Sequence, residues 1–344
     1  MAPLVLIPVS AQADEAPDFA GTTMSGDWGG ERIALWEKGL HLEAAYKADV
    51  LQGRRGGSRA TRNVRHLDLK ARADLERLFG WQDAVAYLNV IDDRGNGSNA
   101  HAGSLMGVSN IEVPVPTARV FNAWVQKGFL EDRVSLLVGI YPVDSEFFVM
   151  ESAANLLQPQ YGTSADLALT NTPSIFNNAA FGLRGRWFSD DRTVYAMGAV
   201  LDGVPNDPRH PKRTAVKLSG ADGAFGIVEF GWMPQESRHA FDFEPTDPAA
   251  VRQSPNVEVH EKYAGYAKFA AGFCGYSRKR DAIVAVDASG QELRRRSYGA
   301  YVLAERTLFG LPSEPLRNLS AFGRYTLADP NTVAIDRSRN LGFK

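Results

Sequence analysis

The chain lacks the features that identify several common classes of protein. Its 344 residues include one cysteine, Cys274, which excludes an intrachain disulfide framework and a cysteine-rich metal site. No apolar run approaches the roughly 18 to 20 residues that a membrane-spanning helix requires. The formal net charge is −2, so nothing in the charge balance points to nucleic acid as a partner. Its class must therefore be read from local patterns.

Catalytic and metal-binding motifs are missing as well. The six histidines are scattered, and none stands in an H-E-x-x-H arrangement. The acidic stretch after Asp92 resembles a calcium loop, but its twelfth position is Gly103 instead of the required glutamate, so it is interpreted as an external loop. There is no phosphate-binding glycine loop and no G-x-S-x-G elbow. We therefore expect no enzyme, no catalytic residue, no metal and no cofactor, although an enzyme of an unfamiliar kind stays open.

Alternation of apolar and charged residues is the strongest pattern in the chain. Over residues 65–78 leucines and alanines alternate with charged residues, which predicts a strand with one apolar and one charged face. A helix is the alternative, because Leu67, Ala71 and Leu75 also recur at helical spacing. A second alternating run over 84–92 follows a short polar turn, and this favours a hairpin. Such a strand could stand in a soluble sheet or between lipid and a water-filled lumen.

The same alternation recurs from residue 41 onward and predicts about eleven strands. The later runs lie at 121–129, 134–140, 183–187, 194–200, 224–232, 263–277, 298–307 and 319–326. Short turns near Trp81, Asp132 and Asp190 alternate with long connections rich in glycine and proline, at 92–119, 142–180, 202–222 and 233–262. Tight periplasmic turns and long external loops are typical of outer-membrane barrels. The predicted fold class is all-β: an up-and-down antiparallel transmembrane β-barrel with a short N-terminal helix.

The N-terminal region is predicted to lie outside the barrel. Residues 1–13 are apolar and end in an A-x-A pattern, which indicates a partial signal peptide, with a plain tail as the alternative. Residues 14–40 would form a periplasmic segment with a helix over 31–38 that ends at Gly39. Residues 41–344 would form the barrel. Aromatic residues at strand ends suit the interfacial girdles of such a barrel, although core aromatics would give the same pattern: Phe79, Trp81, Phe129, Trp187, Phe188 and Trp232.

Several motifs, in order along the chain, resemble the carbohydrate-selective porins of the OprB family. They include S-G-D-W-G-G-E-R at 25–32, L-E-R-L-F-G-W at 75–81 and the run from Phe121 to Phe147. The similarity extends from about Gly26 to the C-terminus. It implies a 16-stranded barrel in a Gram-negative outer membrane that passes sugars by diffusion. About 11 to 12 of these strands are encoded before Lys344, so we expect a barrel that is incomplete at its C-terminus, as in a fragment or a truncated product.

Polar residues on the alternating strands are the candidates for pore lining and sugar contact. Fixed charges and amides can replace part of a sugar's hydration shell, and aromatic faces can pack against its C–H groups. Most lumen charges only tune the field, so few of the candidates would form the constriction. The candidates are Asp68, Lys70, Arg72, Asp74, Asn122, Trp124, Gln126, Arg184, Arg186, Glu229, Lys268, Glu305 and Arg324.

The expected solutes are mono- and oligosaccharides. Outer-membrane lipid is the expected surrounding, a homotrimer is a candidate assembly, and no nucleic acid is expected. Two other functions fit the same alternation. One is an exported soluble β-protein that binds or hydrolyses glycans. The other is a barrel with a plugged lumen that serves a structural or attachment role. The sequence does not choose the sugar or the loop that narrows the pore.

Overall fold

One antiparallel sheet dominates the computed structural model, which describes residues 17–344 except 56–57, 96, 155, 169–172, 235–265 and 312–313. The proposed signal segment at 1–13 lies outside the described residues. The sheet has 12 strands, and each pairs with the next wall strand along the chain. The strands are β1 (Leu40–Arg55), β2 (Ser58–Asp74), β3 (Ala84–Arg94), β4 (Ala118–Phe129), β5 (Val134–Tyr141), β6 (Ala180–Phe188), β7 (Val194–Asp202), β8 (Ala224–Trp232), β9 (Ala267–Tyr276), β12 (Tyr298–Leu311), β13 (Glu314–Ala328) and β14 (Arg337–Phe343).

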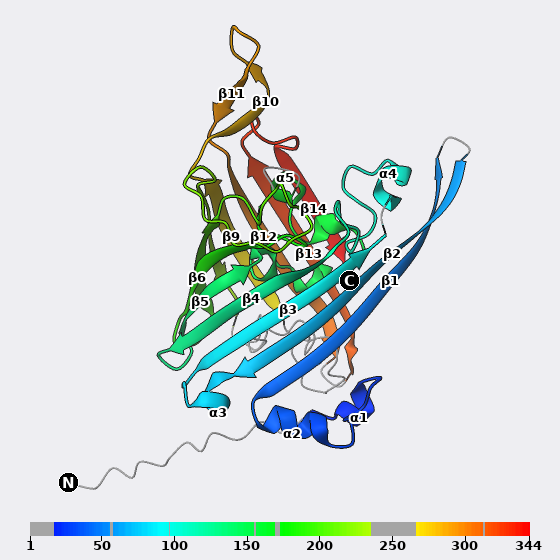
Figure 1. The fold of residues 1–344 in the computed structure, drawn as a ribbon, viewed down its shortest axis with the longest axis vertical. Coiled ribbons are helices and arrows are strands. Elements are labelled where there is room, and N and C mark those ends of the chain that lie inside the picture. The colour runs from blue at the N-terminus through cyan, green and yellow to red at the C-terminus, as the bar shows by residue number, and fades with distance from the viewer. Residues whose placement is uncertain are drawn as a thin grey trace, which may run out of the picture.

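This sheet curves around an interior and forms an up-and-down barrel wall (Figure 1). The predicted all-β antiparallel fold is confirmed, and its wall has 12 strands. The edge strands are β1 and β14, and no pairing joins these two among the described residues. The alternation missed β14 and a hairpin of two further strands, β10 (Arg280–Val286) and β11 (Glu292–Arg295), which projects from one rim. Among the described residues, no helix is long and apolar enough to cross a membrane.

The charged ladder over 65–78 is a strand followed by one helical turn. β2 ends at Asp74 and α3 (Leu75–Phe79) begins at the next residue. The Asp74 carboxylate caps this helix by accepting hydrogen bonds from the N–H groups of Glu76 and Arg77, at 3.0 and 3.1 Å. Gly80 then ends the helix at a φ of +73°, which glycine adopts without strain. The strand prediction therefore holds up to Asp74 and is wrong beyond it.

The N-terminal segment forms two short helices beneath the end of the barrel where α3 lies (Figure 1). These are α1 (Phe19–Thr22) and α2 (Glu31–Glu37), the second close to the predicted 31–38. Arg32 is buried and joins the two helices to the wall. Its guanidinium donates to the Thr23 hydroxyl at 2.8 Å and to the Leu42 carbonyl at 3.2 Å, and it lies over the Phe19 ring. The arginine of the S-G-D-W-G-G-E-R motif thus fixes the lead-in to β1.

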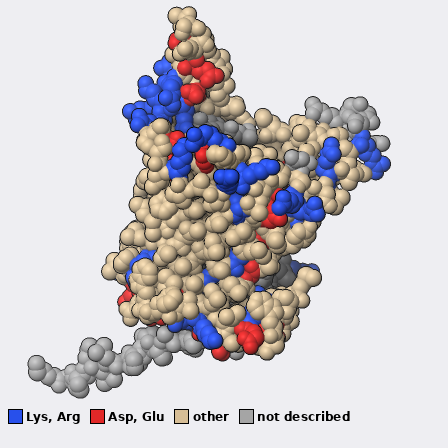
Figure 2. Space-filling view, viewed as in Figure 1, with Lys and Arg blue, Asp and Glu red and all other residues tan. Residues whose placement is uncertain are grey.

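The two faces of the wall have opposite polarity. On β2 the Leu69 side chain points outward and is 46% exposed, whereas neighbouring Asp68 points inward and is 6% exposed. The same contrast recurs around the sheet, with exposed valine, leucine and phenylalanine on the outside and buried charged residues on the inside. In Figure 2 an uncharged band of wall separates the charged residues at the two ends. An apolar exterior around a polar interior matches a wall whose outer face is solvated by lipid.

Exposed aromatic side chains gather at the end of the barrel with the short turns. Five of the six predicted girdle residues are between 42% and 80% exposed there, namely Phe79, Trp81, Phe129, Trp187 and Trp232. The three tryptophans among them have amphipathic rings, which suit a membrane interface. Phe188 is a correction, because its side chain is 2% exposed and packs inside the barrel near Tyr195. It is the residue after Trp187, so alternation turns it inward.

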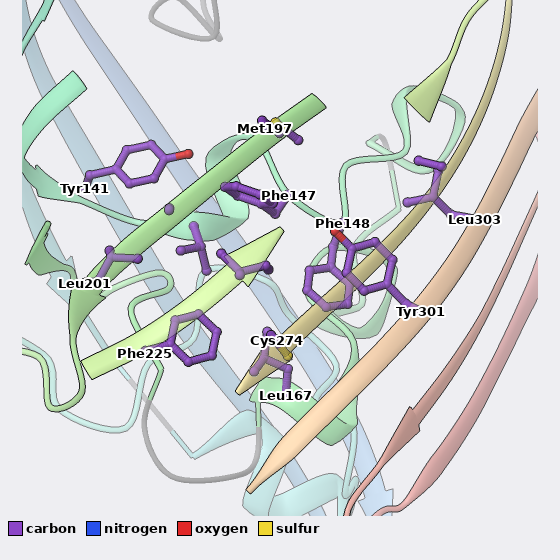
Figure 3. Packing of buried hydrophobic residues seen from close by; sticks show 14 of the residues in the cluster. Tyr141, Phe147, Phe148, Leu167, Met197, Leu201, Phe225, Cys274, Tyr301 and Leu303 are labelled. Atoms are coloured by element: carbon purple, nitrogen blue, oxygen red, sulfur yellow. The ribbon is translucent and has the colours of Figure 1, made fainter. Parts of the chain in front are cut away.

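The connection between β5 and β6 folds into the barrel. It contains three 3-10 turns, Val143–Ser145, Glu151–Ala153 and Pro159–Tyr161, and helix α5 (Ala165–Ala168). Its Phe147 and Phe148 point into the interior among side chains from β7, β8, β9 and β12 (Figure 3). The expectation that the 142–180 connection extends outside is therefore wrong. We call the described residues between 142 and 179 the inner loop.

The alternation of short and long connections also fails at one place. The connections β3–β4, with α4 (Ser98–Ala102), β7–β8 and the hairpin-bearing β9–β12 leave from one end of the barrel, and the turns β4–β5 and β6–β7 from the other (Figure 1). By strand order, the connection after Trp232 leaves from the short-turn end, although it is long. Most of the predicted long connection at 233–262 lies outside the described residues.

Candidate functional site

A cavity of about 900 Å³ lies inside the barrel between the inner loop and strands β1 to β6. Its lining mixes carboxylates, cations, amides and aromatic rings. Lining residues from the wall include Glu43, Lys47, His66, Asp68, Lys70, Tyr87, Asn89, Asn122, Trp124 and Arg184, and the inner loop adds Asp144 and Glu146. The inner loop packs against the opposite side of the interior, where it forms the main apolar core with strands β5 to β9, β12 and β13. Among the described residues, this cavity therefore lies on one side of the barrel.

Glu229 on β8 is the centre of the contact between wall and inner loop. Its carboxylate accepts hydrogen bonds from the Tyr195 hydroxyl at 2.7 Å, from the Tyr301 hydroxyl, and from the Phe148 N–H at 3.2 Å. The Phe148 ring also stacks on Tyr301, with ring centroids 3.7 Å apart (Figure 3). Hydrogen bonds to a buried charged group are stronger than neutral ones. The Glu229 carboxylate thus holds the inner loop in place at Phe148.

Three further inward charges bind the backbone of the same loop. Glu305 accepts hydrogen bonds from the N–H groups of Glu151 and Ser152 at 3.1 and 2.8 Å. The Lys268 ammonium donates to the Val149 carbonyl at 2.9 Å. The Arg324 guanidinium donates to the carbonyls of Gln160, at 2.5 Å, and of Gly162. The wall thus supplies the partners that a buried irregular backbone needs.

A buried arginine cluster holds the first turn of the inner loop against β6. The Arg184 guanidinium donates to both oxygens of Glu146, at 2.8 and 2.9 Å, and to Gln126 Oε1 at 2.6 Å. Arg186 adds a contact of 3.3 Å to Glu146. Burial alone would raise the pKa of Glu146, but the two guanidinium groups outweigh it and hold the pKa below its usual value. Glu146 therefore stays ionised beside the cavity.

Asp144 is the second loop carboxylate on the cavity. Burial raises its pKa to about 6, although the Phe176 N–H donates a hydrogen bond to it at 3.0 Å and works in the opposite direction. No salt bridge to Asp144 is found among the described residues. Its charge therefore changes within a mildly acidic pH range.

The wall on the open side of the cavity carries a connected row of polar groups. His66 lies between Asp68 and Asp93, with nitrogen-to-oxygen distances of 2.9 and 2.7 Å. Asn89 donates to Asp68 at 3.2 Å, and Lys70 is 3.1 Å from Glu43. His66 and Asp68 share β2, and the other pairs join β2 to its neighbours β1 and β3. The row keeps acceptors and donors at fixed positions along the cavity.

An aromatic pair adds an apolar surface to this polar wall. Tyr87 on β3 and Trp124 on β4 are direct cross-strand partners, and their ring centroids are 5.2 Å apart. Both rings line the cavity. A ring face beside hydrogen-bonding groups can contact the C–H face of a sugar while the hydroxyls bind nearby.

The structure places the thirteen predicted residues in three groups. Asp68, Lys70, Asn122, Trp124 and Arg184 line the cavity. Gln126, Arg186, Glu229, Lys268, Glu305 and Arg324 point inward, but their contacts hold Arg184 or the inner loop. Arg72 is half-buried on β2 outside the cavity lining, and Asp74 caps α3. A role in sugar contact stays a prediction for all of them.

Sequence reasoning missed several lining residues. Tyr87 and Asn89 stand on the polar side of the alternating run over 84–92, so that pattern could have identified them. No sequence pattern indicated that Glu146 lines the cavity, because it reaches the lumen on a folded loop and not on an alternating strand. Among the described residues, no three His, Cys, Asp or Glu side chains gather closely enough to hold a metal ion.

An up-and-down barrel with an apolar exterior, a polar interior and an inward loop defines the class of outer-membrane porins. Comparison with known proteins specifies the class. Residues 58–344 match the model of a family described as "Carbohydrate-selective porin, OprB family". The chain belongs to this family, whose members are channels in the outer membrane of Gram-negative bacteria.

Individual relatives agree with the family. Porin B of Pseudomonas aeruginosa is 24% identical over 353 aligned positions, which cover 97% of this chain and 71% of that protein. A putative porin, QuiX, of Acinetobacter baylyi is 28% identical over 131 positions, or 36% of this chain and 30% of that protein. The high-pH structure of Pseudomonas putida OprB superposes with a TM-score of 0.74 at 19% identity, over 94% of this chain and 74% of that one. Its low-pH structure gives a TM-score of 0.53 at 15% identity, over 94% and 76%.

Proposed function

We propose that sugars cross the barrel through the cavity beside the inner loop, with the wall of β1 to β5 as the selective surface. The observation that carries this proposal is the cavity of about 900 Å³, which has charged and amide groups next to the Tyr87–Trp124 pair. Hydroxyl groups of a sugar need donors and acceptors to replace water, and its C–H faces favour aromatic rings. The donors and acceptors are supplied by Asp68, Asn89 and Asn122, and the aromatic surface by Tyr87 and Trp124. Passage needs no catalytic residue and no cofactor.

Selectivity in this proposal comes from several weak contacts. A solute must bind well enough to enter and weakly enough to leave, so contacts distributed along a wall suit a channel better than one tight site. The opposite side of the passage is the inner loop, which contributes Asp144 and Glu146. Because wall charges hold this loop by its backbone, its position sets the width of the passage. Mono- and oligosaccharides are the proposed solutes.

The test compares two aromatic substitutions in planar bilayers. Added glucose or maltose should reduce the ion current of the wild-type channel, because a bound sugar obstructs the cavity. Trp124→Ala should weaken this block by up to about tenfold, the scale of a lost ring contact of about 0.5 to 1.5 kcal/mol. Phe273→Ala is the matched control, because that ring is on the outer wall and is 53% exposed. Equal block in wild type and Trp124→Ala would contradict the proposed path, and a silent folded protein would favour the plugged barrel.

Assembly and placement extend the proposal. The segment 14–40 is proposed to face the periplasm, since α1 and α2 lie at the short-turn end. The apolar outer wall is proposed to contact outer-membrane lipid and, in a homotrimer, neighbouring copies. Crosslinking of the folded protein in its native membrane measures the number of subunits. A band at the monomer mass alone would remove the trimer from the proposal.

A further inference from the structure

The outer wall also has hollows of its own, unrelated to the lumen. A groove of about 640 Å³ runs over the outward face of β6 to β9. Its floor contains four outward-facing glycines, Gly185, Gly198, Gly226 and Gly275. Exposed apolar side chains form its rims: Leu183, Val200, Val228 and Phe273. The groove is therefore smooth, apolar and open toward the bilayer.

The protein's own packing does not require glycine on this floor. A Cβ on Gly226 would meet no atom within 4 Å, and one on Gly185 would meet only Leu136, at 3.6 Å. The inward glycines of the same sheet differ. A Cβ on Gly231 would lie 2.0 Å from the Tyr195 ring, and one on Gly272 would lie 2.2 Å from the Tyr301 ring. The outward glycines thus leave space for something outside the chain.

A cationic cluster stands at the upper end of this groove. The groove reaches Ser277, and the chain continues as Arg278-Lys279-Arg280 into the projecting hairpin, which returns through Arg294-Arg295-Arg296 to β12. Register places Arg280 opposite Arg295 across this hairpin. Figure 2 shows Lys and Arg gathered between the hairpin and the uncharged wall. The cluster and the groove are thus continuous along the outside of the barrel.

Three cations of the cluster are available to a ligand. The Arg278 and Arg280 guanidinium groups donate to the carbonyls of Gly220 and Gly203, and Arg294 pairs with Asp281 at 3.1 Å. Lys279, Arg295 and Arg296 are exposed and have no side-chain partner among the described residues. Arg296 lies in the short connection between β11 and β12, directly before outward-facing Tyr298. Unpaired cations at the rim of an apolar wall complement an anionic lipid headgroup.

We infer that this groove and the cations Lys279, Arg295 and Arg296 bind a phosphorylated glycolipid of the outer leaflet. One acyl chain would lie on the glycine floor, and a headgroup phosphate would contact the cluster above it. The inference rests on the long-loop end facing the cell exterior and is independent of the sugar path. Burial of an acyl chain on a flat apolar floor and charge-assisted bonds to phosphate act on the same molecule. A free phosphate lacks the acyl chain and an uncharged lipid lacks the phosphate, so neither would make both contacts.

Native mass spectrometry of the full folded chain in detergent, titrated with bisphosphorylated lipid A, tests the site. Wild type should bind one lipid at the lowest concentrations. Lys279→Gln/Arg296→Gln should weaken binding about tenfold or more, because each cation near an anionic lipid contributes about a factor of five. Gly226→Leu should also weaken it, since the Cβ would meet no atom within 4 Å and the rest of the leucine would occupy the groove. Dephosphorylated lipid A should bind weakly, and millimolar inorganic phosphate should not displace the lipid.

Matched controls separate the site from general effects. Lys212→Gln/Arg213→Gln removes the same charge from two exposed cations in the β7–β8 connection, and Ala196→Leu adds the same bulk at an outward position beyond the groove. Both should bind like wild type. The inference would be overturned if Lys279→Gln/Arg296→Gln bound lipid A as tightly as the control Lys212→Gln/Arg213→Gln. It would also be overturned if the wild type bound lipid A equally well with and without its phosphates. Equal affinity for phosphatidylglycerol would also overturn it, by removing the preference for a glycolipid. Sugar block of the current, measured on the same variants, should be unchanged, so failure here is distinct from failure of the sugar path.

Discussion

At the scale of single residues, the inward charges of the wall divide into those that face the cavity and those that hold the inner loop. Glu229, Glu305 and Arg324 belong to the second group, because their hydrogen bonds go to loop backbone. Alternation alone cannot separate the groups, since both face inward. Only the contacts of each side chain show whether it is free to meet a solute.

The Arg184–Glu146 pair gives a test of loop anchoring by one residue. Arg184→Gln should destabilise the docked loop by about 3 to 5 kcal/mol, because the more distant Arg186 is then the one cation that still pairs with the buried Glu146 carboxylate among the described residues. The loop should become sensitive to protease, and single-channel conductance should rise. Arg184→Gln/Glu146→Gln is the control, in which the buried carboxylate is removed together with its nearest cation. Equal protease sensitivity in the single and double variants would contradict this account.

Asp144 gives a test by pH. Burial raises its pKa to about 6, so the carboxylate is negative at pH 7.5 and loses its charge as the pH falls through about 6. Loss of a negative charge from the cavity lining should lower the preference for cations. The reversal potential in a salt gradient, measured at pH 7.5 and 5, reports that preference. Asp144→Asn should show the low-pH value at both pH values. A wild type whose reversal potential does not change over this range would refute the assignment.

At the scale of elements, inward glycines allow aromatic side chains to reach across neighbouring strands. Gly272 on β9 is the register partner of both Glu229 on β8 and Tyr301 on β12. The Tyr301 ring lies over Gly272 and its hydroxyl donates to Glu229. Glycine is needed here because of this close approach, since the backbone is ordinary extended strand. Because Gly272 has no side chain, Tyr301 on β12 reaches across β9 to Glu229 on β8, which also binds the inner loop.

Gly272→Ala should therefore cost about 1 to 3 kcal/mol of unfolding free energy, the range for overpacking at a tight site. The added Cβ would lie 2.2 Å from the Tyr301 ring and would move it away from Glu229. Gly226→Ala is the matched control, because its Cβ would meet nothing within 4 Å. Urea titration of the folded barrel in lipid vesicles measures the difference. Equal midpoints for the two variants would show that the ring contact contributes nothing.

The elements also show what the sequence could and could not reveal. Strand alternation has a period of two, so it correctly assigned Leu69 to the outside and Asp68 to the inside. The short helix α3 could have been found from its capping residue Asp74 and from Gly80. The inward fold of the 142–179 segment could not, because it depends on distant contacts such as Phe148 N–H to Glu229, 81 residues away. No local pattern records such a pair.

At the scale of the whole molecule, the barrel reverses the polarity of a soluble protein. Its core lies between the inner loop and the wall, and its outer face is an exposed apolar surface. The reversal explains why composition gave no sign of a membrane protein: only every second wall residue faces lipid. The polar half of each strand lowers the mean hydropathy to −0.24. The fold, and the contact of its outer face with lipid, could therefore be inferred only from the alternation of apolar and polar residues along each strand.

The reversal predicts opposite outcomes for the same substitution on the two faces. Leu183 is outward on β6 and 60% exposed, so Leu183→Arg should cost about 2 to 4 kcal/mol of folding free energy in the bilayer. Asn122 lines the cavity on β4, so Asn122→Arg should fold normally and reduce sugar flux, because the new side chain occupies the passage. Heat-modifiable migration on gels measures folding, and liposome swelling measures flux. In a soluble β-protein the exposed arginine at 183 would be harmless and the buried one at 122 damaging, so that reversed result would contradict the membrane barrel.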